Sequence, residues 1–179
     1  MARTKASRAR QVVLTLVVVL GLAAPGLAVV PAAGAATSLP RCGTEELSAQ
    51  LKPGSPGAGQ RYATVVLTDI STHSCTLGGY GGLALLGGPG NGVPTDLRRV
   101  ASPAPRTLTL SPDGSARSLL HWTVIQAADE PATCEPTGVT VVVTPPDRTT
   151  ALLRPWTFGA VCQHGLIRQN AYVPGSAAF

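Results

Sequence analysis

Hydrophobic and polar positions alternate along much of this chain with the two-residue period of a β-strand. Residues 60–70 are the clearest strand candidate, and there apolar or β-branched side chains such as Tyr62, Val65 and Val66 fall on both faces. A segment with apolar side chains on both faces is typical of a central strand in a covered sheet. Further strands are predicted over residues 83–86, 106–110, 115–125, 138–144, 149–153, 157–162 and 166–173.

Turn-forming sequences separate these segments. Residues 87–92 are Gly-Gly-Pro-Gly-Asn-Gly and predict a loop, whereas residues 111–114, Ser-Pro-Asp-Gly, match a type I turn. About eight short strands with turns between them predict an all-β fold, specifically an antiparallel immunoglobulin-like β-sandwich. One helical turn is predicted at residues 44–46, and residues 52–59 are predicted to form a flexible loop.

The first 35 residues follow the three-part pattern of a secretory signal peptide. A basic start is followed by an apolar run over 12–22 and then by the small residues Ala33-Gly34-Ala35. Two prolines keep the uninterrupted apolar stretch below the roughly 20 residues of a membrane-spanning helix. We therefore expect export with cleavage after Ala35, no permanent membrane anchor, and a single domain over residues 36–179.

The net charge argues against a nucleic-acid partner. The chain has 14 Lys and Arg residues against 9 Asp and Glu, a formal charge of +5. Arg3, Lys5, Arg8 and Arg10 belong to the predicted signal peptide, and without them the charge falls to +1. So small an excess provides no basic surface for a phosphate backbone, so no nucleic-acid partner is expected.

The cysteines predict a covalent framework. The four of them lie in the predicted mature domain, and an even number in an exported chain favours two disulfides. Their wide spacing argues against a zinc site, whose ligands usually come in close pairs. Three connectivities are possible, and the sequence excludes none. Because segments near in sequence tend to be neighbours in space, we favour Cys42–Cys75 and Cys134–Cys162.

Two consecutive segments resemble a known family. Residues 66–71 are Val-Leu-Thr-Asp-Ile-Ser, and residues 75–82 are Cys-Thr-Leu-Gly-Gly-Tyr-Gly-Gly. They resemble secreted actinobacterial proteins of the domain of unknown function 4232 family, in which a strand ending in Thr-Asn-x-Ser precedes Cys-x-Leu-x-Gly-Tyr-Pro-Gly. Similar segments follow in the same order: residues 110–116, Trp122, Cys134, residues 143–146, Pro155-Trp156 and Val161-Cys162.

The resemblance covers nearly all of the predicted mature chain. It implies export, paired cysteines and a β-sandwich, and it implies no particular activity. Asp69 stands where the family has asparagine, and Gly81 stands where it has proline. Within the motif, glycines such as Gly79 permit a tight reversal, and Tyr80 is expected to pack its ring inward and hydrogen-bond across the corner.

The remaining polar residues form no recognisable catalytic, metal-binding or cofactor-binding motif. The sequence contains neither a G-x-S-x-G elbow, nor a P-loop, nor an H-x-x-x-H spacing. His73, His121 and His164 are expected at the surface, and Asp129-Glu130 is expected in an exposed acidic loop. We therefore expect no cofactor and no enzymatic activity, and a hydrolase with dispersed residues is the least favoured alternative.

Trp122 and Trp156 allow two interpretations. Exposed tryptophans on a sheet can stack on sugar rings, whereas buried ones anchor a core. Aromatic residues make up only 4% of the chain, so few other large anchors exist. Burial is the favoured interpretation for both side chains.

Two functional hypotheses follow from these observations. The preferred one is a non-catalytic extracellular or cell-envelope binding or structural module, with an envelope polymer or an extracellular protein as its partner. The alternative is a secreted protease inhibitor that presents a disulfide-braced loop over residues 127–137 or 87–96. Fold class does not decide between them.

Overall fold

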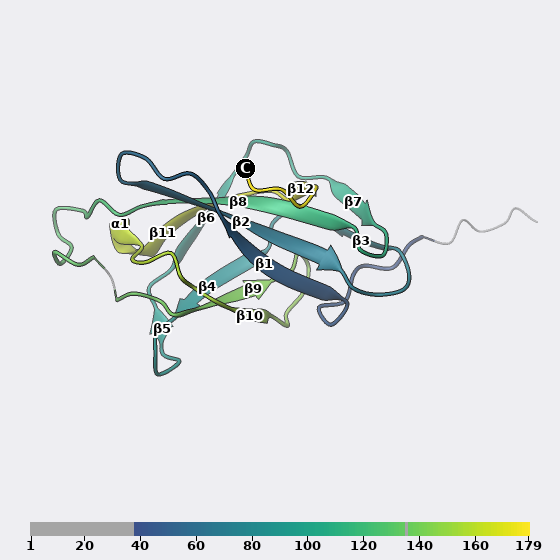
Figure 1. The fold of residues 1–179 in the computed structure, drawn as a ribbon, viewed down its shortest axis with the longest axis horizontal. Helices are drawn as coiled ribbons and strands as arrows, with labels where there is room; N and C mark the ends of the chain where they lie inside the picture. Colours follow the sequence, from purple (N-terminus) through teal and green to yellow (C-terminus); the bar gives the residue numbers. More distant parts are fainter. Residues whose placement is uncertain (1–37, 135) are drawn as a thin grey trace, which may run out of the picture. The chain divides into compact units, whose positions relative to one another are not determined.

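The computed structural model describes residues 38–134 and 136–179 (Figure 1). The predicted signal peptide and its cleavage site lie outside the described residues. Within the described part of the chain, no helix is both long enough and apolar enough to cross a membrane. Almost every element is a β-strand, which confirms the predicted all-β class.

The largest sheet has six strands (Figure 1). Residues 63–67 of its second strand are buried on both faces, which explains the apolar side chains on both faces of that segment. Its order is β1 (Leu47–Pro53), β2 (Gln60–Asp69), β8 (Ser115–Thr123), β11 (Leu166–Asn170) and β6 (Asp96–Val100), with β12 (Val173–Pro174) also paired to β8.

Two smaller sheets accompany the large one, and all of their strand pairs are antiparallel. The four-stranded sheet has the order β10 (Leu152–Pro155), β9 (Thr140–Thr144), β4 (Gly82–Leu86) and β5 (Gly92–Val93). The two-stranded sheet pairs β3 (Cys75–Gly78) with β7 (Thr107–Leu110). The short element α1 (Cys162–Gly165) contains left-handed backbone and is not a regular α-helix.

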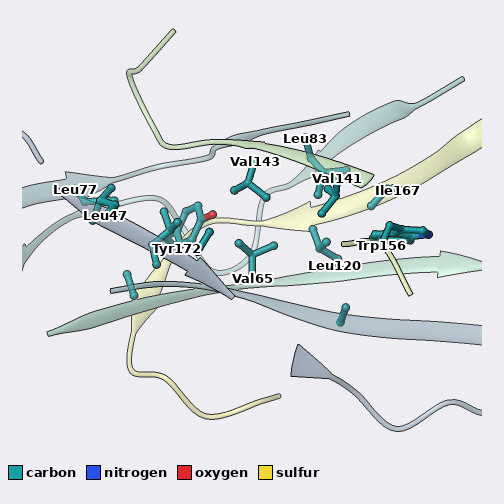
Figure 2. Close-up of a cluster of buried hydrophobic side chains, with 14 of the residues drawn as sticks. Leu47, Val65, Leu77, Leu83, Leu120, Val141, Val143, Trp156, Ile167 and Tyr172 are labelled. Carbon is teal, nitrogen blue, oxygen red and sulfur yellow. The ribbon is translucent and has the colours of Figure 1, made fainter. Parts of the chain in front are cut away.

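One hydrophobic core joins the six-stranded and four-stranded sheets. Figure 2 shows Val65 and Leu120, from β2 and β8, lying opposite Val141 and Val143 from β9. Each of these four side chains is at most 1% exposed. Full burial of one such side chain contributes about 1.5–3 kcal/mol, so these facing strands hold the two sheets together.

The structure corrects the prediction of a purely antiparallel fold. β11 and β6 run parallel, with Ile167 opposite Leu97. No strand is predicted for β6, because its sequence Asp-Leu-Arg-Arg-Val carries too few apolar side chains to show alternation. Strand direction depends on which distant segment a strand meets, and local periodicity does not contain that information.

Two other predicted elements are wrong. Residues 44–46 form a hydrogen-bonded turn rather than a helical one, since Leu47 N–H donates to Thr44 O (3.2 Å), and β1 then occupies part of the predicted loop. Residues 157–162 form no strand. There the chain turns sharply at Gly159, whose φ is +78°, and the Trp156 indole N–H donates to the Gly159 carbonyl (2.8 Å).

Candidate functional site

A groove lies where two edge strands meet. β1 is an edge of the six-stranded sheet, β10 is an edge of the four-stranded sheet, and the two strands contact each other (Figure 1). The groove has a volume of about 370 Å³, which falls within the range of ligand-binding sites, roughly 300–1,000 Å³. Its lining residues are Ala49, Gln50, Leu51, Arg154, Pro155, Thr157 and Phe158.

The backbone of β1 directs polar groups toward this groove. Gly54 N–H donates to Tyr62 O (2.9 Å), which makes this pair a hydrogen-bonded position of the antiparallel β1–β2 ladder. Because hydrogen-bonded and non-hydrogen-bonded positions alternate in such a ladder, Ala49 and Leu51 point their N–H and C=O groups away from β2. These two residues therefore form the free edge of the sheet.

Arg154 links the two free edges. On β10, Trp156 N–H donates to Val139 O (2.8 Å), so the alternation turns the backbone groups of Leu153 outward. The Arg154 guanidinium donates from Nε to Ala49 O (2.6 Å) and from Nη1 to Leu153 O (2.8 Å). Among the described residues, no carboxylate forms an ion pair with Arg154, so its positive charge is held at the groove without a counter-ion.

An aromatic cluster supports one side of the groove. The ring centres of Trp156 and Phe158 are 5.1 Å apart, and those of Trp122 and Trp156 are also 5.1 Å apart. Trp122 and Trp156 are 1% and 4% exposed, so both indoles belong to the core and not to a sugar-stacking surface. Phe158 is partly buried and is the aromatic side chain that lines the groove.

A second candidate site is the corner where residues 124–134 meet α1. The Cys134–Cys162 disulfide joins the two segments with a Cα–Cα distance of 5.0 Å. Gln163 and His164 have φ values of +60° and +57°, in the left-handed region. This conformation costs roughly 1–2 kcal/mol for each residue that is not glycine, so other interactions must hold it.

Glu130 supplies such interactions. Its carboxylate accepts hydrogen bonds from the backbone N–H groups of Gln163 (2.8 Å), Ala127 (2.6 Å) and His164. Burial raises the pKa of the Glu130 carboxyl, but the three backbone donors and the nearby His164 lower it by more, so the net pKa lies below its ordinary value. The arrangement is therefore a carboxylate clamp on a strained turn.

The prediction of an exposed acidic loop is therefore only half right. Asp129 is exposed, but Glu130 is 8% exposed and its carboxylate is covered by α1. The physical reason is that the donors to Glu130 come partly from a segment 33 and 34 residues later in the chain. Two adjacent acidic residues in a loop carry no sequence signal for such a contact.

Comparison with known proteins identifies the family. The model of the domain of unknown function DUF4232 matches residues 42–171, a range that includes all four cysteines and both candidate sites. The chain belongs to the DUF4232 family. Neither a search of curated proteins nor a search of solved structures found a match.

Both disulfides of this DUF4232 domain follow the favoured connectivity. Cys42–Cys75 joins the segment before β1 to the start of β3 with a Cα–Cα distance of 4.9 Å, and Cys134–Cys162 forms the corner. None of the cysteines is free within the described residues. Each bond closes a loop of about 30 residues, which stabilises the domain by roughly 3.5 kcal/mol in the chain-entropy model.

Asp69 lies against the first disulfide of the DUF4232 domain. The residue is 0% exposed, and its Oδ1 accepts a hydrogen bond from Ser71 N–H (2.9 Å). Its Oδ2 lies 3.5 Å from the Sγ of Cys75. Because a disulfide sulfur carries no hydrogen, that contact does not satisfy the carboxylate oxygen. The site thus holds an incompletely paired buried acid.

The glycine-rich reversal of the DUF4232 motif is tied to distant segments. Gly79 has a φ of +88°, and its carbonyl accepts a hydrogen bond from Tyr172 N–H (2.9 Å). Tyr80 donates its hydroxyl to Val100 O (2.7 Å), and the Arg99 guanidinium lies 5.2 Å from the Tyr80 ring centre. The expected hydrogen bond is therefore present, although the Tyr80 side chain is half-buried rather than packed fully inward.

His121 participates in a surface pair on the six-stranded sheet. Its ring stacks on Tyr62 with a centroid distance of 4.7 Å, and its Nε2 lies 2.7 Å from Gln60 Oε1. Burial and, to a smaller extent, the positive charge of Arg168 lower the pKa of His121. This environment favours a neutral imidazole that packs and hydrogen-bonds.

The other two histidines each lie near a carboxylate at the surface. His73 Nε2 is 3.1 Å from Glu46 Oε1, and His164 Nε2 is 3.2 Å from Asp129 Oδ1. Both histidine side chains are about half exposed, at 52% and 55%. In the part of the chain that the structure describes, no group of three or more His, Cys, Asp or Glu residues could hold a metal ion.

Sequence reasoning identifies the corner but misses the groove. The predicted inhibitor loop at 127–137 contains Glu130 and Cys134. No strand is predicted for β1, because its residues 47–51 carry no prediction and its last two residues fall in the predicted loop at 52–59. The sequence does contain a signal for β1, because Leu47, Ala49 and Leu51 alternate with polar residues and point inward. Nothing in the sequence indicates that β1 and β10 lie side by side.

Proposed function

We propose that this chain is an exported, non-catalytic binding module with an immunoglobulin-like β-sandwich, and that the groove between β1 and β10 is its binding site. The observation that carries the proposal is Arg154. Its guanidinium is fixed by two backbone carbonyls, lines the groove and has no carboxylate partner among the described residues. A preorganised charge at a groove favours recognition of a ligand with a negative or acceptor group.

The chemistry of the groove supports binding rather than catalysis. Gln50, Arg154 and Thr157 provide its polar side chains, and the remaining lining residues are apolar. General acid–base or nucleophilic catalysis requires a titratable group or an activated nucleophile near the reacting atoms, and the groove lining includes no Asp, Glu, His, Cys or Ser.

Export is supported by the covalent framework. Both disulfides are structural links between separate segments, and such bonds persist mainly in oxidising compartments. The N-terminal pattern of basic, apolar and small residues is consistent with the same destination. The proposed partner is accordingly an extracellular protein or a polymer of the cell envelope.

A groove-filling variant tests the proposed site. The protein purified from culture medium is used to capture proteins from that medium and to bind insoluble envelope polymer, with bound material identified by mass spectrometry. Thr157→Trp places a large side chain at the groove, and Thr109→Trp is the matched control at an exposed threonine on β7, outside both candidate sites. The proposal expects a partner that Thr109→Trp retains and Thr157→Trp loses. Equal capture by both variants would exclude the groove as the site.

Protease inhibition is the second candidate function, and the corner favours it. Residues 131–133 are exposed, while Cys134 is disulfide-bonded and Glu130 is clamped to α1. A loop held rigid at its base loses little entropy on binding, which is how many protease inhibitors gain affinity. The test is titration of secreted serine and cysteine proteases with the protein. Unchanged activity across the panel at micromolar protein would reject this candidate.

A further inference from the structure

We propose that the groove binds a short extended polypeptide segment bearing a carboxylate, and that the segment adds to the free edge of β1. This inference rests on the proposed function, because it names the class of ligand for the same groove. Three features of the described residues support it: the unpaired backbone of β1, the position of Arg154 and the proline that ends the strand.

The first feature is the hydrogen-bonding capacity of the β1 edge. Ala49 and Leu51 line the groove and point their backbone groups away from β2. Ala49 O accepts from Arg154, but no hydrogen bond within the described residues uses Leu51 N–H or Leu51 O. An extended peptide satisfies such a donor and acceptor together, which is how strand addition provides affinity without a particular side-chain sequence.

The second feature is charge complementarity beside that edge. The Arg154 guanidinium already donates from Nε and Nη1 to backbone carbonyls, so its orientation is set before a ligand arrives. Its Nη2 makes no hydrogen bond to the described residues. Because an arginine–carboxylate hydrogen bond is charge-assisted, a carboxylate on the bound segment is the group that this position recognises best.

The third feature limits the length of the bound segment. β1 ends at Pro53, which has no N–H to donate. Toward the start of the strand, the Ala49 carbonyl already accepts a hydrogen bond from Arg154. Strand addition is therefore confined to the positions around Leu51, and a segment of about three to five residues suffices to span them, since an extended chain rises about 3.3 Å per residue. The ordered backbone groups at Leu51 favour an amide backbone over a polysaccharide, which lacks the regular alternation of N–H and C=O.

A peptide-library experiment tests this inference. The protein is mixed with a random library of soluble pentapeptides that have free C-terminal carboxylates, and retained peptides are identified by mass spectrometry. The best retained peptide is then resynthesised with a fluorophore in three forms: unmodified, C-terminally amidated, and N-methylated at alternate residues. Affinities are measured by fluorescence anisotropy for the wild type, for Arg154→Gln and for Arg98→Gln. Arg98 is an exposed arginine on β6, at the opposite edge of the six-stranded sheet.

The expected results are specific to strand addition with carboxylate recognition. N-methylation should weaken binding about tenfold, because it removes a backbone donor. Arg154→Gln should weaken binding of the unmodified peptide about tenfold, and Arg98→Gln should leave it unchanged. Loss of affinity on amidation identifies the terminal carboxylate as the bound group, and retained affinity assigns an Asp or Glu side chain of the peptide instead. N-methylated peptide provides a test that does not depend on the folding of any protein variant.

Three outcomes would overturn the inference. In the first, the wild type retains no peptide beyond what the Thr157→Trp variant retains. In the second, the N-methylated peptide binds as tightly as the unmodified one. In the third, Arg154→Gln binds the unmodified peptide as tightly as the wild type does. If envelope polymer binds in a groove-dependent way while no peptide does, the groove remains a binding site but its ligand is a polysaccharide. If a second copy of the chain occupies the edge, analytical ultracentrifugation shows a dimer that Thr157→Trp abolishes, which also contradicts the peptide as ligand.

Discussion

The Glu130 carboxylate accepts a hydrogen bond of 2.8 Å from the backbone N–H of Gln163, a residue that lies 33 positions later in the chain. This contact joins a loop to a left-handed turn that the Cys134–Cys162 disulfide also ties down. The carboxylate and the disulfide therefore act on the same corner, one through hydrogen bonds and one through a covalent link.

Replacement of Glu130 should loosen this corner. Glu130→Gln removes the charge that strengthens three backbone hydrogen bonds, and we expect a lower melting temperature than for the wild type. Asp129→Asn is the matched control, because the neighbouring carboxylate is 76% exposed and accepts no backbone hydrogen bond among the described residues. Differential scanning calorimetry at neutral pH measures both. Equal melting temperatures for the two variants would show that the clamp contributes nothing.

The contribution of Glu130 should disappear in acid. The pKa of the folded carboxyl lies below its ordinary value of 4.5, so the unfolded chain takes up the proton first as the pH falls. The stability that the clamp provides is therefore complete above about pH 4.5 and is lost as the pH falls through the folded pKa. We expect the difference in unfolding free energy between wild type and Glu130→Gln to shrink below that pH. Urea titrations at a series of pH values measure it, and a difference that grows in acid would contradict the assignment.

Each disulfide should carry a large share of the stability. Their loops span 33 and 28 residues, for which chain entropy predicts a loss of about 3.5 kcal/mol when either bond is removed. The paired variants Cys42→Ser with Cys75→Ser, and Cys134→Ser with Cys162→Ser, are compared with the wild type by urea denaturation. Total stabilities are commonly about 5–15 kcal/mol, so we expect loss of both bonds to leave the chain unfolded. If the fully reduced protein unfolded at the same urea concentration as the oxidised protein, the expected contribution of the disulfides would be refuted.

Two tyrosines provide a comparison of a paired and an unpaired hydroxyl. Tyr80 donates to Val100 O, whereas the Tyr172 hydroxyl is buried without a hydrogen-bond partner among the described residues, and burial raises its pKa. Tyr80→Phe should therefore cost about 0.5–1.5 kcal/mol, and Tyr172→Phe should cost less or be stabilising. Thermal unfolding measures both variants. A larger loss for Tyr172→Phe than for Tyr80→Phe would contradict the hydrogen-bond assignment.

Substitution of Asp69 should relieve an incompletely paired buried acid. Asparagine keeps an oxygen to accept the Ser71 N–H and removes the charge beside the first disulfide, so we expect Asp69→Asn to raise the free energy of unfolding by about 1 kcal/mol. Asp69→Ala is the comparison, since it removes the acceptor and should destabilise. Chemical denaturation distinguishes the two. If Asp69→Asn were as destabilising as Asp69→Ala, the charge itself would be required at this position.

The sequence predicts the elements that depend on local periodicity. The alternation over residues 60–70 and 115–125 corresponds to β2 and β8, and the long antiparallel pairing of these strands forms the centre of the six-stranded sheet. Side chains on successive strand residues face opposite sides, so a strand with a buried face must leave this pattern in its sequence. β1 leaves the same pattern more weakly, and β6 leaves almost none because its exposed positions carry charged residues.

The all-β class, the expectation of two disulfides and the resemblance to the family can all be read from the chain, whereas the pairing of the cysteines was only favoured and needed the structure to establish it. The parallel pairing of β6 with β11, the burial of Glu130 and the contact of β1 with β10 at Arg154 could be found only in the folded structure. The two groups of features differ in the separation along the chain over which they arise. Alternation and turn formation depend on neighbouring residues, whereas the hydrogen bond from Arg154 to the Ala49 carbonyl joins residues that are 105 positions apart. A contact at that separation depends on how whole sheets pack, which no local pattern records.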